Sequence, residues 1–144
     1  MIPVSDLALG ETLFTHIDPV DGSQTNLAIG RLVRHVIDAD LPTKSVVLTL
    51  SDAKNIVMHR GLERHRYDRL TLELCKIPLV FCHWPDKSWL LADGNHRYVR
   101  LVLEFQIRWT QAYLLEQDVW QDYVVDGKPS IDPKTLLRSF SGII

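Results

Sequence analysis

The chain has 144 residues, of which 46% are hydrophobic and 24% are charged, as is typical of one globular domain. Its formal net charge of −2 and pI near 6.3 disfavour a protein that grips nucleic acid over its whole surface, because such proteins are usually basic. No basic-then-apolar leader and no long apolar run is found, so the sequence predicts neither a secretion signal nor a membrane span.

The two cysteines, Cys75 and Cys82, match no metal-binding or redox spacing. We therefore expect both to be buried thiols in a reducing compartment, and we expect the protein to be cytoplasmic.

The first forty residues predict a strand, a turn and a helix. Residues 13–17 suit a short strand, and residues 18–23 are rich in turn-forming residues. The apolar spacing over residues 27–37 fits one face of a helix. The other face of this helix carries Arg31, Arg34 and His35. We interpret that basic face as solvated surface in preference to a binding patch.

A strand and two helices are predicted next. Residues 45–50 are β-branched and short, which favours a strand. Ser51 or Asp52 is expected to cap a helix over residues 53–60, which Gly61 ends. A second helix is predicted over residues 63–75, and a break before Leu70 is the alternative.

The remaining elements predict the fold class. Residues 77–83 and 88–92 are expected to pair as a hairpin around a turn at 84–87. A helix to about residue 104, a strand over 108–114 and a short helix over 116–123 should follow, and residues 133–140 should form a last helical turn or a docking tail. We predict one small α+β domain over residues 1–144, with a core at about 45–125 and a tail at 126–144. A doubly wound parallel sheet is disfavoured, because a hairpin makes its strands antiparallel.

A polar cluster follows the second hairpin strand and opens the next helix. Gly94 permits the tight turn, and Asp93 or Asn95 is expected to cap the helix. His96 and Arg97 would lie in its first turn, where the helix dipole already places positive charge. An anion bound at this turn would explain the two basic residues.

The run Asp93-Gly94-Asn95-His96-Arg97-Tyr98 resembles the Asp-Gly-x-His-Arg box of the ParB/sulfiredoxin superfamily. The resemblance spans roughly residues 45–115. It implies a sheet-and-helix domain that holds nucleotide phosphates at this turn, and the implied ligand is ATP, ADP or CTP, with or without Mg²⁺. The cysteine that sulfiredoxins use is replaced by Asn95, so that activity is not expected. The helix-turn-helix domain of partition proteins and the substrate-binding sequence of free serine kinases are not found.

Each residue of the box has a structural alternative to a role in binding. Arg97 is the preferred phosphate ligand, and a salt bridge to Asp93 or Glu63 is its alternative. His96 would bind the anion or act in catalysis, or else serve as a cap or a packed polar residue. Asp93 would orient Arg97 and His96, or help to hold a metal.

The densest charged run of the chain, residues 59–69, supplies the other candidates. Solvated surface is an equally weighted interpretation of this run. Superfamily members take nucleotide contacts from this region, which implies Arg64, Arg66 and Arg69 as phosphate ligands and Tyr67 as a base-stacking residue. Glu63 and Asp68 are the candidate acids or bases. No metal site is expected, because the six-residue spacing of His59 and His65 places them on different helix faces.

Two functions from different classes follow. The first is a nucleotide-binding domain that hydrolyses the nucleotide or transfers its phosphoryl group. The second is a non-catalytic module that recognises a nucleic-acid phosphate or an acidic protein partner. Assembly with a second copy stays open, and no membrane partner is expected.

Overall fold

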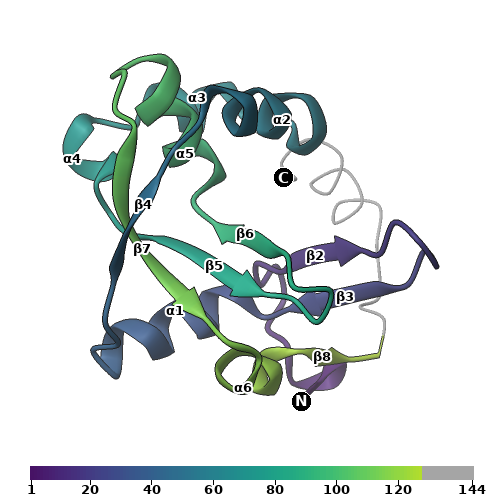
Figure 1. The fold of residues 1–144 in the computed structure, drawn as a ribbon. Coiled ribbons are helices and arrows are strands. Elements are labelled where there is room, and N and C mark those ends of the chain that lie inside the picture. Colours follow the sequence, from purple (N-terminus) through teal and green to yellow (C-terminus); the bar gives the residue numbers. More distant parts are fainter. Residues whose placement is uncertain (128–144) are drawn as a thin grey trace.

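A computed structural model describes residues 1–127 of the chain. Its centre is a four-stranded mixed sheet in the order β4-β7-β5-β6 (Figure 1). The strands are β4 (Lys44–Val47), β7 (Trp109–Leu115), β5 (Leu79–His83) and β6 (Trp89–Asp93). The outer pairs are antiparallel, whereas β5 and β7 are parallel. The predicted α+β class is therefore confirmed.

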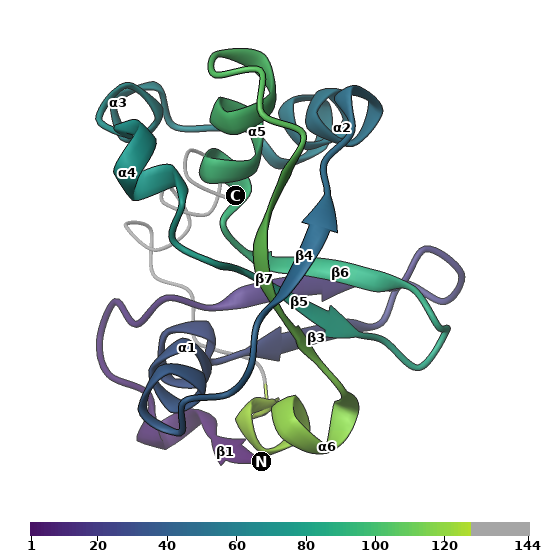
Figure 2. The ribbon, with the colours of Figure 1, turned by 60° about the vertical axis from the view of Figure 1, so that its left-hand side comes forward.

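The helices lie at two ends of the molecule. The group at one end is α2 (Leu50–Arg60), α3 (Arg64–Asp68), α4 (Leu72–Cys75) and α5 (Asn95–Leu103). Figures 1 and 2 show this group together at the top, with α1 (Ile29–Asp38) and α6 (Gln117–Trp120) at the opposite end. None of the helices within residues 1–127 is long and apolar enough to cross a membrane.

Short elements surround the lower end of the sheet. The strands β2 (Phe14–Ile17) and β3 (Gln24–Leu27) form an antiparallel hairpin. Strand β1 (Ile2–Pro3) pairs in parallel with β8 (Val125–Asp126). Two 3-10 helices complete the described part, η1 (Val4–Asp6) and η2 (Gln121–Tyr123).

The sheet separates two hydrophobic clusters, because alternate residues of a strand point to opposite faces. Val80 and Cys82 of β5 belong to one cluster, and Leu79 and Phe81 contribute to the other. The first cluster takes buried residues from the N-terminal part, namely Phe14, Leu27, Ile29, Leu32 and Val36. The second joins the sheet to α2, α4 and α5. The first forty residues thus supply much of one core.

Several local predictions are confirmed. Residues 79–83 and 89–93 form the expected hairpin, closed by the Trp84 N–H donating to the Ser88 carbonyl at 2.8 Å. Both Cys75 and Cys82 are free and buried. The helix after the hairpin ends at Leu103, close to the predicted end.

Other predictions are wrong in identifiable ways. Strand β3 ends at Leu27, where the predicted helix begins, and α1 starts only at Ile29. The cap of α2 is Thr49, whose hydroxyl accepts the Asp52 N–H at 3.1 Å, rather than Ser51 or Asp52. The single helix predicted over 63–75 is two short helices, α3 and α4, so the alternative, a break before Leu70, is confirmed. The second starts afresh because the Thr71 hydroxyl accepts the Leu74 N–H at 3.2 Å. The predicted helical turn at 133–140 lies outside the described residues.

Candidate functional site

The turn between β6 and α5 is built around Gly94. Its φ of 106° lies in the left-handed region, which side chains rarely adopt. A Cβ at this position would lie 2.5 Å from Leu79 Cδ2 and 3.0 Å from Arg97 Nη2. Glycine is therefore required here by the backbone angle and by the space.

Helix α5 begins without a side-chain cap. The residue at the cap position is Gly94, so the prediction that Asp93 or Asn95 caps the helix is wrong. The first hydrogen bond within the helix runs from the Tyr98 N–H to the Gly94 carbonyl at 2.9 Å. The backbone N–H groups of the first turn therefore have no acceptor within the helix. Such a terminus, with its positive dipole end, favours an anion.

Arg97 is engaged by the protein itself. Its Nη2 donates to the Pro78 carbonyl at 3.1 Å and to Asp93 Oδ2 at 3.2 Å, and its side chain is only 15% exposed. The salt bridge to Asp93, the alternative to phosphate binding for this residue, is thus formed. Arg97 Nε is buried without a hydrogen-bond partner among the described residues. In this arrangement Arg97 joins the start of β5 to the turn.

His96 connects the turn to the charged run. The residue is buried, with 8% of its surface exposed, and its Nε2 accepts the Glu63 N–H at 3.0 Å. Burial is the main cause that lowers the pKa of His96, and the nearby Arg66 lowers it further. The imidazole is therefore neutral at pH 7, with its proton on Nδ1, because Nε2 serves as an acceptor. His96 holds Glu63 beside the turn through its backbone.

The acids of the charged run face arginines. The Glu63 carboxylate lies 3.6 Å from Arg66 Nη1. The Asp68 carboxylate lies 3.2 Å from Arg64 Nε and 3.7 Å from Arg100 Nη1. Of the two candidate acids, only Glu63 is in contact with the box, and that contact is made by its N–H.

Two further residues of the run, Tyr67 and Arg69, have different surroundings. Tyr67 is buried, its hydroxyl donates to Glu104 at 3.2 Å, and the Arg100 guanidinium lies 4.8 Å from its ring centroid. Burial and the Glu104 carboxylate raise the pKa of Tyr67 to about 12. The prediction that Tyr67 stacks on a base is therefore wrong, because the ring is enclosed by protein. Arg69 is exposed and has no ion pair within residues 1–127.

Arg60 belongs to the charged run but is not among the phosphate ligands expected from the sequence. It ends α2, three residues before Glu63, and its guanidinium carbon lies 5.2 Å from the centroid of the Phe14 ring. Burial lowers the pKa of the guanidinium, yet no carboxylate of the described residues lies within 4.0 Å of it. Phe14 belongs to the same core cluster as Ala92, two residues before Gly94. Since the contact with Phe14 joins positions far apart in sequence, no local pattern indicates it.

Two surface hollows lie away from the turn. One of about 520 Å³ lies beside β3 and β8, where Asn26 and Val125 are among its lining residues. The other, of about 720 Å³, follows α1, and we call it the α1 groove. Its polar lining residues are Glu11, Arg31, Arg34, His35, Asp38 and Tyr123. Among the described residues, no cluster of three or more His, Cys, Asp or Glu side chains could hold a metal ion.

No protein-family model, no curated protein and no solved structure matches the chain. The function is therefore inferred from the residues of the site and their geometry.

Proposed function

We propose that the chain is a ParB/sulfiredoxin-like domain that binds the phosphates of ATP, ADP or CTP at the N-terminus of α5. The observation that carries the proposal is the turn at Gly94, which leaves this helix terminus without a side-chain cap directly after a strand. The resemblance of residues 93–98 to the superfamily's box supports the same location.

Backbone and side-chain groups would have different roles in binding the phosphates. The first-turn N–H groups of α5 would bind phosphate oxygens, and Arg97 would hold the turn in shape through Asp93 and Pro78. Arg60 is a partly buried guanidinium without a carboxylate among the described residues, so it is our candidate for the second phosphate contact.

A catalytic form of this proposal would be nucleotide hydrolysis or phosphoryl transfer. Glu63 is the candidate acid or base, because its backbone is fixed to His96 beside the turn. Asp93, directly before Gly94, is the carboxylate that could contribute to a magnesium site here. A single carboxylate binds Mg²⁺ weakly. A Mg²⁺ ion would therefore be bound mainly by the nucleotide's own phosphates.

A non-catalytic module is the second candidate, and a specific observation favours it. The groups proposed for catalysis are already engaged: His96 with the Glu63 N–H, Glu63 with Arg66, and Asp68 with Arg64. The same helix terminus would then recognise a phosphate of a nucleic acid or an acidic protein partner without any reaction.

The test is a titration of the full chain with each nucleotide, with and without Mg²⁺, and with inorganic phosphate. A ligand that binds only the folded state at one hundred times its Kd stabilises it by about 2.7 kcal/mol, so the melting temperature should rise. Calorimetry then gives the affinity. Release of phosphate or of a nucleoside diphosphate would establish the catalytic form, whereas binding without turnover would establish the module.

A matched pair of variants locates the site. Arg60→Gln should weaken phosphate binding by about tenfold or more, since it removes a charge-assisted hydrogen bond. Lys54→Gln removes an exposed charge from the same helix and should leave affinity unchanged. If no nucleotide and no phosphate raises the melting temperature, the proposal is refuted. Equal losses in both variants would show that only the overall charge of α2 matters.

A further inference from the structure

Helix α1 lies at the opposite end of the molecule from α5 (Figure 1), and the α1 groove along it is lined by side chains of both charges. Gly30 forms part of its lining, and a Cβ at this position would meet no atom within 4 Å. A glycine near the start of a helix costs stability relative to alanine. Its presence leaves backbone accessible in the groove.

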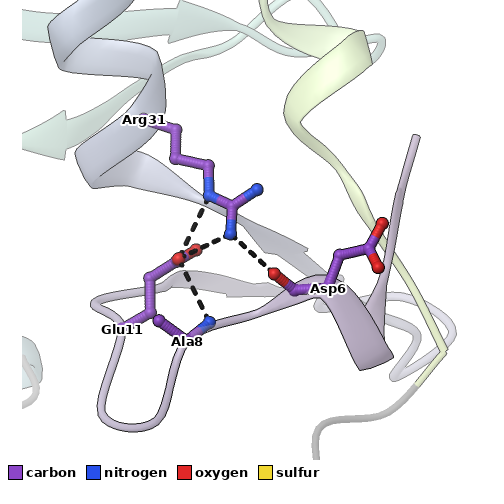
Figure 3. Close-up of polar contacts among 4 residues, drawn as sticks. All are labelled: Asp6, Ala8, Glu11 and Arg31. Carbon is purple, nitrogen blue, oxygen red and sulfur yellow. Dashed lines mark hydrogen bonds and ion pairs between the residues drawn. The ribbon is translucent and has the colours of Figure 1, made fainter.

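One ion pair of the groove is fixed in place. Arg31 reaches from α1 to the N-terminal loop, where its Nη2 donates to Glu11 Oε1 and to the Asp6 carbonyl, each at 2.8 Å (Figure 3). Glu11 Oε1 also accepts the Ala8 N–H at 3.4 Å. The other carboxylate oxygen, Oε2, is buried and has no donor among the described residues. The pair is therefore anchored to the N-terminal loop.

A second pair of opposite charges, Arg34 and Asp38, lies one helical turn apart on α1. Arg34 and Asp38 both line the groove, but within residues 1–127 neither makes an ion pair, with each other or with another residue. A basic residue four positions before an acidic one is the weaker order for pairing on a helix. Arg34 and Asp38 thus remain available to a ligand.

Aromatic rings contribute to the same groove. The ring centroids of His35 and Tyr123 lie 5.7 Å apart with a 36° tilt, and both residues line the groove. They offer an apolar surface next to the charged groups. A ligand that carries an apolar side chain would bury it there.

We propose that the α1 groove binds a free α-amino acid, with the carboxylate on Arg34 and the ammonium group on Asp38. The two charges of the groove that have no ion pair within residues 1–127 support a zwitterion, because Asp38 would repel a simple anion and Arg34 would repel a simple cation. The aromatic pair favours an amino acid with an apolar side chain. This site is separate from the phosphate site proposed at α5.

The experiment titrates the full chain by calorimetry with three probes of one shape. They are L-phenylalanine, its N-acetyl derivative, which lacks the positive charge, and its amide, which lacks the negative charge. L-phenylalanine should bind saturably, and each derivative should bind about tenfold more weakly or worse, because one charged partner is lost. No saturable binding of L-phenylalanine, or equal binding of a derivative, would overturn the proposal.

Variants test the residues. Arg34→Gln and Asp38→Asn should each weaken L-phenylalanine binding by about tenfold or more. The controls Arg108→Gln and Asp118→Asn remove exposed charges outside the groove and should leave it unchanged. Losses of the same size in the controls would overturn the assignment. Arg60→Gln should also leave L-phenylalanine binding unchanged, so failure of the nucleotide proposal and failure of this one are distinguishable.

Discussion

Replacement of Gly94 by alanine tests the geometry of the turn, because two separate costs meet at this residue. Its φ of 106° would cost alanine about 1–2 kcal/mol. The new Cβ would also lie 2.5 Å from Cδ2 of the fully buried Leu79, and relief of such overpacking costs about 1–3 kcal/mol. The free energy of unfolding should therefore fall by about 2–5 kcal/mol.

Alanine substitutions at two other glycines distinguish the cost of the positive φ from the cost of the clash. Gly22 has a φ of 74°, but a methyl group added there would meet no atom within 4 Å, so Gly22→Ala should lose only about 1–2 kcal/mol. Gly30 has neither problem, and Gly30→Ala should gain about 0.5–1 kcal/mol. The assay is urea denaturation of the three variants with the m-value as a check on two-state unfolding. A Gly94→Ala loss no larger than that of Gly22→Ala would refute the predicted clash with Leu79.

Three further predictions concern side chains. Arg97→Ala should lower the free energy of unfolding by about 1–3 kcal/mol in denaturant titrations, because the Pro78 carbonyl loses its donor, and an unchanged midpoint would contradict this. Stability should fall as the pH is lowered from 8 to 5, since burial lowers the pKa of His96 below its ordinary value of 6.5 and the unfolded chain then binds more protons. His96→Gln should make the free energy of unfolding less dependent on pH between 8 and 5. A curve identical to that of the unchanged protein would contradict His96 as the titrating group. The thiols of Cys75 and Cys82 should react with a thiol reagent only after unfolding, because both are buried and burial raises the pKa of Cys82 to about 12; rapid labelling of the native protein would show otherwise.

The parts of the fold that depend on neighbouring residues could be predicted from the sequence. The second hairpin, the turn at Gly94 and the helix that follows rest on turn chemistry and on apolar spacing over a few positions. Strand β3 could not be predicted because its four residues, Gln24–Leu27, are mostly polar, and its pairing with β2 and the burial of Asn26 and Leu27 appear only in the fold. The break between α3 and α4, which the sequence offered as the alternative to one helix, is fixed by the cap at Thr71.

The roles of the candidate site residues could be predicted only in part, because their partners are distant in sequence. The Asp93–Arg97 pair is four residues apart, so the sequence itself offers it as an alternative. The Pro78 carbonyl that Arg97 also binds is 19 residues away, and the Glu104 carboxylate that accepts from Tyr67 is 37 residues away. A one-dimensional pattern carries no information on such contacts.

The position of β7 has a consequence for how the protein folds during synthesis. This strand lies between β4 and β5, although it is the last of the four to be made. The hydrogen bond from Thr43 to Gln111 spans 68 positions. During synthesis β4 therefore has no strand to pair with until a further stretch longer than half of the described chain has been made. The hairpin of β5 and β6 forms locally and meanwhile presents the edge that β7 later covers. Unpaired strand edges associate with one another, so we expect a nascent chain halted before Trp109 to aggregate more readily than a chain that includes β7.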